Sequence, residues 1–197
     1  MIALTTSGLV VGCQKAPEPA AEIDISFELI DESGRTVTSR DYEGQVRLVF
    51  FGYTSCPDIC PITLHNIATA LRSLGPLATQ VNVLFISVDP KRDTPEILAR
   101  YTDAFHPAVI GLTGTYDQIV DVTMGFRTTF GYSTSSDGVD KSLSKEEYQA
   151  SSPNASYVPF HSSQIYMIGR ANELLDIIGY GSKPTYIAAK LRDYIDD

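Results

Sequence analysis

The chain has few cysteines and few basic residues. Only three cysteines occur in 197 residues, at positions 13, 56 and 60, which is too few for a scaffold held together by disulfides. Lys and Arg number 15 against 24 Asp and Glu, so the formal net charge is −9 at pH 7. This balance argues against a nucleic-acid-binding protein, which normally carries a basic face, and against electrostatic adhesion to anionic membranes. What remains is a soluble, globular chain with room for one full core.

The apolar stretch at residues 2–12 has no charged residue and is too short to span a bilayer. It fits the central region of a secretion signal, and Leu9 to Cys13 resembles the lipobox of bacterial lipoprotein precursors. We therefore predict that Cys13 is lipidated and that a Pro-rich tether follows it, holding the domain at the periplasmic side of a bacterial membrane. No Lys or Arg precedes the stretch, so this interpretation expects a translation start further upstream. The alternative is an unstructured N-terminus with a chance cysteine.

The remainder, residues 24–197, is predicted to form a single domain. Alternating or continuous apolar runs predict strands, at residues 25–30, 35–39, 46–53, 81–88, 109–112, 164–168 and 173–178. Helical spacing and start and stop signals predict helices, at residues 61–74, 94–105, 115–126 and 184–194. The polar segment 133–159 is expected to be a loop or a partly ordered insertion, with one helical turn at Lys145–Ala150.

Buried strands that alternate with helices imply a layered α/β fold. A cysteine pair where the first buried strand ends and a helix begins is the thioredoxin arrangement. We therefore expect a thioredoxin-like fold, with a central mixed sheet, helices on both faces and an N-terminal β-hairpin extension. In open α/β sheets this end of a strand is where active sites lie.

The pair Cys56 and Cys60 is separated by three residues, one more than in the usual redox motif. A helix N-terminus stabilises thiolate, which is both the nucleophile of disulfide exchange and the form that binds metal. Two sulfurs on one side of a helical turn suit Cu(I), with Zn(II) next, and they can also close into a disulfide. From these residues alone, both a metal site and a redox pair remain open.

Three histidines are candidates for a third ligand. In a thioredoxin-type fold, the segment that enters the strand at 164–168 packs beside the cysteine pair, so His161 is the geometric choice. We interpret His65 and His106 as ordinary surface or hydrogen-bonded side chains. Asp89 ends the strand at 81–88 on the same side as Cys56. It is a tentative site residue that could buffer cysteine reactivity or contact a partner, and a role as the cap of the following turn is at least as well supported.

Several stretches together resemble the Sco/SenC family of copper-binding, thioredoxin-like proteins. They are FGYTSCPDICP at 51–61, SVDPKRDTPE at 87–96, GLTGT at 111–115 and Phe160-His161-Ser162. The resemblance runs from about residue 24 to the C-terminus. It implies a copper chaperone and thiol reductase that helps to build the binuclear copper centre of cytochrome c oxidase. Carried over, the copper ligands for Cu(I) and Cu(II) are Cys56, Cys60 and His161.

Two departures from the family pattern bear on the site. Phe160 stands where the family usually has aspartate, which could orient the imidazole or tune copper. The segment 133–159 is longer than usual and could change how the site meets its partner, expected to be the copper-bearing oxidase subunit or another copper chaperone. A second function class is a membrane-anchored thiol-disulfide reductase with no copper in its working cycle, and a peroxiredoxin-like peroxidase is a distant third. His161 discriminates, because a pure reductase does not require an imidazole there.

Overall fold

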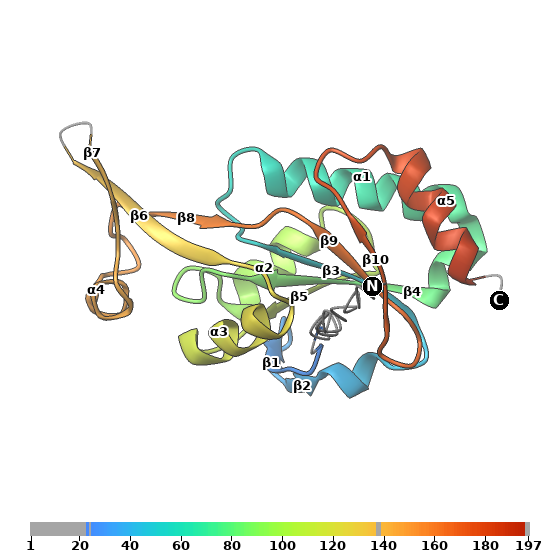
Figure 1. Ribbon diagram of the computed structural model, residues 1–197, viewed down its shortest axis with the longest axis horizontal. Helices are drawn as coiled ribbons and strands as arrows, with labels where there is room; N and C mark the ends of the chain where they lie inside the picture. The colour runs from blue at the N-terminus through green and yellow to red at the C-terminus, as the bar shows by residue number, and fades with distance from the viewer. Residues whose placement is uncertain (1–22, 24, 137–138, 196–197) are drawn as a thin grey trace, which may run out of the picture.

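The structure is a computed structural model that describes residues 23, 25–136 and 139–195. Cys13 and the predicted anchor lie outside the described residues. Within those ranges, seven strands form one sheet (Figure 1). Their spatial order is β10 (Leu174–Ile178), β9 (Ile165–Ile168), β3 (Val46–Gly52), β4 (Val81–Ser87), β5 (Val109–Thr113), β1 (Glu28–Asp31) and β2 (Thr36–Thr38).

The sheet is mixed, as predicted. The three central strands β3, β4 and β5 are parallel, while β9 and β10 on one side and β1 and β2 on the other run antiparallel to their neighbours. All seven residues of β3 are buried, which matches the continuous apolar run expected of a strand covered on both faces. The predicted N-terminal hairpin is β1 and β2, and it extends the sheet beside β5.

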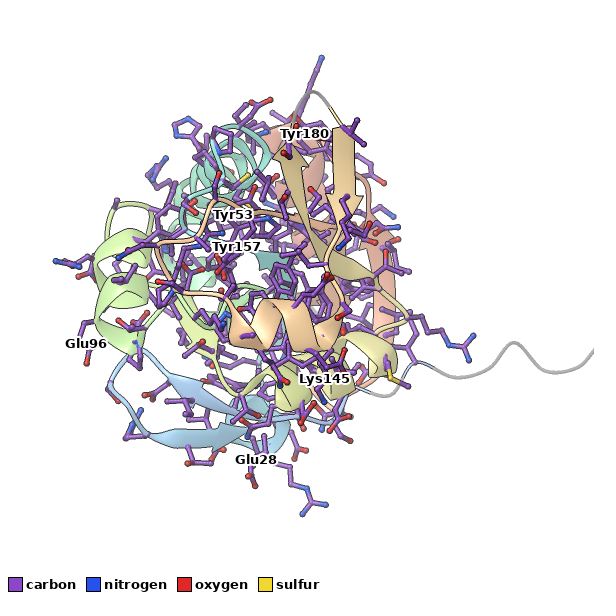
Figure 2. The ribbon with its side chains drawn as sticks, turned by 90° about the vertical axis from the view of Figure 1, so that its left-hand side faces the viewer. Glu28, Tyr53, Glu96, Lys145, Tyr157 and Tyr180 are labelled. Atoms are coloured by element: carbon purple, nitrogen blue, oxygen red, sulfur yellow. The ribbon has the colours of Figure 1, made fainter. Side chains whose placement is uncertain are left out.

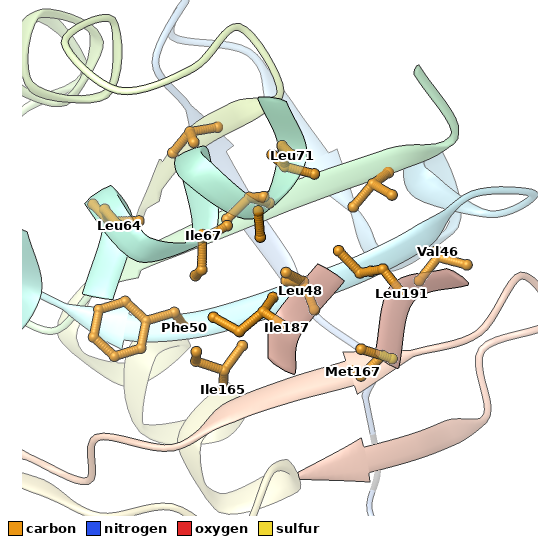
Figure 3. Packing of buried hydrophobic residues seen from close by; sticks show 14 of the residues in the cluster. Val46, Leu48, Phe50, Leu64, Ile67, Leu71, Ile165, Met167, Ile187 and Leu191 are labelled. Atoms are coloured by element: carbon orange, nitrogen blue, oxygen red, sulfur yellow. The ribbon is translucent and has the colours of Figure 1, made fainter. Parts of the chain in front are cut away.

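Helices cover both faces of this sheet. One core cluster joins β3 and β4 to α1 (Ile59–Leu74), α2 (Pro95–Thr102) and α5 (Pro184–Ile195). Figure 3 shows α1 and α5 side chains, such as Ile67 and Ile187, over β3 residues such as Leu48. The opposite face packs against α3 (Tyr116–Gly125) and the N-terminal hairpin. These layers confirm the thioredoxin-like fold that the order of elements predicted.

Residues 133–159 are not a loop, which corrects the expectation from sequence. They belong to a second sheet whose order is β7 (Val139–Ser142), β6 (Phe130–Ser136), β8 (Val158–His161). A short helix, α4 (Lys145–Ala150), confirms the predicted helical turn. The sequence is polar because the residues of these strands are mostly exposed or half-buried. The apolar cluster of this unit is built on three buried tyrosines that are far apart in the sequence: Tyr132, Tyr148 and Tyr157. We call this unit, residues 130–161, the insertion; it projects beyond one end of the main sheet (Figure 1).

No helix in the described ranges has the length and apolar character needed to cross a bilayer.

Two of the three isoleucines of α1 provide a test of the core. Ile67 is fully buried against the sheet, whereas Ile62 on the same helix is 44% exposed. We expect Ile67→Ala to lower the free energy of unfolding by about 2–5 kcal/mol, because it leaves a cavity, and Ile62→Ala to change it by only about 0.5 kcal/mol. Urea unfolding of the reduced protein measures both. Equal effects of the two substitutions would contradict this packing.

Candidate metal centre

The cysteine pair lies where β3 gives way to α1. Helix α1 begins at Ile59, two residues earlier than predicted, so Cys60 lies in its first turn. The backbone N–H of Cys56 donates to the carbonyl of Tyr53 at 3.2 Å, and the N–H of Cys60 points to Cys56 Sγ at 3.5 Å. Gly52 makes room for the buried sulfur, because a Cβ there would lie 2.8 Å from Cys60 Sγ. A side chain at Gly52 would therefore collide with Cys60 and with the ring of Phe85.

His161 arrives at the same place from the insertion, as the last residue of β8. Its Nε2 lies 3.5 Å from Cys60 Sγ, and its Nδ1 lies 2.9 Å from the carbonyl oxygen of Ser162. Because a carbonyl only accepts, Nδ1 is the protonated nitrogen of a neutral ring, and Nε2 presents its lone pair towards the cysteine. The rings of Phe50 and Tyr53 lie edge to face with the imidazole at 6.1 and 5.9 Å. The imidazole is thus held at one nitrogen and by two rings.

The sulfurs of Cys56 and Cys60 and the imidazole of His161 all lie within 4.8 Å of one another. A metal ion typically binds sulfur at about 2.3 Å and nitrogen at about 2.0 Å. With a sulfur–metal–nitrogen angle of about 110–120°, the sulfur and the nitrogen would lie roughly 3.5–3.7 Å apart. The observed separation of Cys60 Sγ and His161 Nε2 is 3.5 Å. The donor set therefore fits a metal ion with soft and borderline ligands, such as copper.

The environment makes the three groups chemically unequal. Burial raises the pKa of the Cys60 thiol strongly, and the nearby Cys56 adds to this effect. Burial also works against ionisation of Cys56, but hydrogen bonds from the backbone of Asp58 and Cys60 and from the phenol of Tyr53 bring its pKa below the ordinary thiol value. Burial lowers the pKa of His161, so its ring is neutral at neutral pH. Cys56, which is half-buried, is the more accessible and more acidic thiol.

The other candidates lie apart from this group. His65 is exposed on α1, and His106 accepts a hydrogen bond at Nδ1 from the backbone N–H of Ala108. Asp89 is fully buried, and its carboxylate accepts from Arg92 and from the hydroxyls of Tyr148 and Tyr157. It is not a member of the cysteine and histidine group, and its role in buffering cysteine reactivity stays a prediction.

Two neighbours of the site make contacts that the sequence did not predict. Tyr53 touches both Cys56 and His161, and the ring of Phe160, 49% exposed, helps to line an open pocket over Cys56. Phe160 thus adds an apolar wall at the position where the resemblance led us to look for aspartate. A glycine within an otherwise apolar strand signals a close approach, so Gly52 could have been found. Tyr53 lies in the stretch FGYTSCPDICP that carries the family resemblance, but that stretch does not predict its contact with His161.

Fold and site together define a thioredoxin-like domain with a dithiol and imidazole centre at the carboxyl end of its central strand β3. A family model described as SCO1/SenC matches residues 15–196 of this sequence. The chain belongs to the SCO1/SenC family.

Individual relatives agree with this assignment. An SCO2-like protein of Rickettsia prowazekii is 39% identical over 153 residues, which covers 78% of this chain and 67% of the relative. The solved structure of Bradyrhizobium japonicum ScoI with copper bound has a TM-score of 0.72 at 34% identity, covering 87% of this chain and 99% of that one. Yeast Sco1 with copper bound gives 0.74 at 26% identity, covering 90% of each chain.

The inequality of the two thiols predicts selective alkylation. In the reduced, metal-free protein, iodoacetamide should modify Cys56 well before Cys60. Because the pKa of Cys56 is lowered, its reaction should reach half its maximal rate at a lower pH than that of a free cysteine measured under the same conditions. Peptide mapping by mass spectrometry across a pH series measures both rates. The Cys60→Ser variant is the control. Faster modification of Cys60 than of Cys56 would refute the assignment.

Proposed function

We propose that this protein is a metallochaperone that carries copper on Cys56, Cys60 and His161 and delivers it to the binuclear copper centre of cytochrome c oxidase. The observation that carries the proposal is the convergence of two thiols and one imidazole within 4.8 Å. Membership of the SCO1/SenC family and the likeness to copper-bound relatives support it.

The donor set suits a metal that changes oxidation state. Two thiolates satisfy soft Cu(I), and the imidazole adds the harder donor that also tolerates Cu(II). A disulfide of the target would accept the two electrons of the reduced pair: the target disulfide becomes two thiols while Cys56 and Cys60 close into a disulfide. Closing the pair removes both thiolate charges and releases the ion, so copper release and reduction of the target are linked.

The competing proposal is a thiol-disulfide reductase that works without copper. A low-pKa, accessible Cys56 beside a buried Cys60 would serve such an enzyme as attacking and resolving thiols. The position of His161 favours the copper carrier. Its unprotonated Nε2 contacts the sulfur of Cys60 at 3.5 Å, an arrangement that a reductase does not need and that a metal site does.

The finer parts of the proposal concern place and partner. We propose that residues 1–23 are a signal, lipidated at Cys13, with a tether, and that residues 24–197 are the copper-binding domain. The anchor would hold the domain on the periplasmic side of a bacterial membrane. Its partner there would be the copper-bearing oxidase subunit or another copper chaperone.

Removing the imidazole should separate the two oxidation states. We expect reduced wild-type protein to bind one copper ion, and His161→Ala to lose most of its Cu(II) affinity, by about 10- to 100-fold or more, while two thiolates still hold Cu(I). Competition titrations with chromophoric chelators measure both affinities, with His65→Ala as the matched control on an exposed histidine. If His161→Ala binds both Cu(I) and Cu(II) as tightly as the wild type does, His161 is not a ligand and the reductase proposal is favoured.

Copper affinity should also depend on pH with a definite sign. Binding requires deprotonated ligands, so affinity falls as pH falls. Since burial lowers the pKa of His161 from its ordinary value of about 6.5, protons compete mainly at the two thiols and not at the imidazole between pH 8 and 7. The wild type and His161→Ala should therefore show the same pH slope for Cu(I) over this range. A steeper pH dependence of Cu(I) affinity in the wild type would show that protons also compete at His161, and would contradict this prediction.

The anchor can be tested on native protein from membranes. Mass spectrometry should find an N-terminus at Cys13 that carries a diacylglyceryl-type modification, and Cys13→Ser should move the protein from the membrane fraction to the soluble fraction. An intact and unmodified N-terminus would rule out the anchor without affecting the copper proposal.

A further inference from the structure

The loop between β4 and α2, residues 88–94, contains two aspartates that are completely buried, Asp89 and Asp93. Burying a carboxylate is costly unless hydrogen-bond donors surround it. The donors around each aspartate therefore show which segments of the chain that aspartate holds in place. Neither carboxylate belongs to the copper-binding group.

Asp93 holds the segment that leads into the cysteine pair. Its Oδ2 accepts from the backbone N–H of Thr54 at 3.0 Å, and its Oδ1 accepts from the hydroxyl of the same threonine at 2.6 Å. Ser87 at the end of β4 donates to Oδ2 at 2.5 Å. Thr54 lies two residues before Cys56, so Asp93 fixes the start of the cysteine turn.

Asp89 holds the other half of the site. Its Oδ1 accepts from the hydroxyl of Tyr157 at 2.8 Å and from Tyr148 at 3.3 Å, and both rings belong to the insertion. Tyr157 directly precedes β8 and lies four residues before His161. The guanidinium of Arg92, itself paired with Asp89, stacks on the Tyr157 ring at 3.9 Å. Figure 2 looks onto this end of the molecule, with Tyr157 near the centre of the view.

Further contacts tie the insertion to the same loop. The hydroxyl of Tyr132, on β6, donates to the carbonyl of Val88 at 2.6 Å, and β6 pairs with β8 so that Phe130 faces His161. Lys91 binds the last carbonyls of α4, including those of Gln149 at 2.9 Å. The insertion therefore contacts the loop through a side chain of β6 and through backbone carbonyls of α4.

The two carboxylates are also bound to each other through the loop. Ser87 Oγ accepts from the N–H of Asp89 at 3.0 Å while donating to Asp93, and the N–H of Asp93 donates to the carbonyl of Asp89 at 3.0 Å. These bonds hold the two carboxylates at a fixed spacing within one short turn.

We infer that residues 88–94 act as a positioning loop that sets the distance between the two halves of the copper site. Asp93 holds the thiol half through Thr54, and Asp89 holds the imidazole half through Tyr157. This inference rests on the proposed copper site, and Thr54 and Tyr157 are positioning residues that touch no metal. Loss of one hydroxyl should therefore affect only the ligands that it positions.

The test uses substitutions that remove one hydroxyl each, since removing either carboxylate would strip several buried donors at once. In Tyr157→Phe, Cu(II) affinity should fall about tenfold or more, as for other groups that orient a metal ligand, while Cu(I) affinity stays within about threefold of wild type, since the two thiolates dominate its binding. Thr54→Val removes the hydroxyl that binds Asp93 and so loosens the turn that carries the two cysteines. Affinity for both Cu(I) and Cu(II) should therefore fall. Tyr116→Phe is the matched control, because Tyr116 packs in the same aromatic cluster but its hydroxyl has no hydrogen bond among the described residues.

Two further readouts separate positioning from general loss of stability. The nitrogen hyperfine coupling of the Cu(II) electron paramagnetic resonance spectrum should weaken in Tyr157→Phe and stay unchanged in Tyr116→Phe. In metal-free protein, hydrogen exchange should quicken at residues 158–163 in Tyr157→Phe but not in α1. Wild-type Cu(II) affinity and coupling in Tyr157→Phe would overturn the inference, as would faster exchange throughout the chain.

The exchange experiment contains no copper, so it distinguishes the two proposals. If wild-type protein binds no copper, the proposed function fails, yet local exchange at residues 158–163 would still show that Tyr157 positions His161. If wild-type protein binds copper and neither hydroxyl matters, the function stands and the positioning role is wrong.

Discussion

The parallel, in-register pairing of β3 with β4 is the constraint on which the rest of the site depends. Gly52, the last residue of β3, lies opposite Ser87, the last residue of β4, and the N–H of Val88 donates to the carbonyl of Gly52 at 2.8 Å. The cysteine turn and the positioning loop therefore leave the sheet side by side. Because parallel strands end at the same edge, groups that are more than thirty residues apart in sequence begin their loops at a common point.

A second consequence of this arrangement is that the two cysteines differ in burial. Cys60, in the first turn of α1, is buried in the hydrophobic core, while Cys56 lines an open pocket and is half-buried. A buried thiol resists ionisation and an exposed one is accessible to a partner, so a metal or a target thiol would meet Cys56 first. Phe160 and Ile59 line the same pocket and give it apolar walls beside Cys56.

The insertion solves a geometric problem that the thioredoxin-like core leaves open. The core supplies the two sulfurs from a single turn, but no core strand or helix in the described ranges brings a third soft or borderline ligand to them. Residues 130–161 leave the main sheet, form their own three-stranded sheet and return with His161 at the end of β8. Such a projecting arm would be loosely placed without support, and its tyrosines supply this support by packing on the positioning loop.

The sequence by itself determined the layered fold and the neighbourhood of the site, because both follow from local patterns. Buried apolar runs such as 46–53, the glycine and proline stops, and the cysteine spacing each act over a few residues. Local patterns did not predict the sheet of the insertion, because its strands are mostly exposed. Its buried cluster is formed by Tyr132, Tyr148 and Tyr157, which are spread over 26 positions of the sequence. Only the tertiary structure decided that Asp89 turns to the insertion and that Tyr53 touches both Cys56 and His161. Such contacts join distant segments, and a side chain's partner across the fold is set by packing and not by its own sequence neighbours.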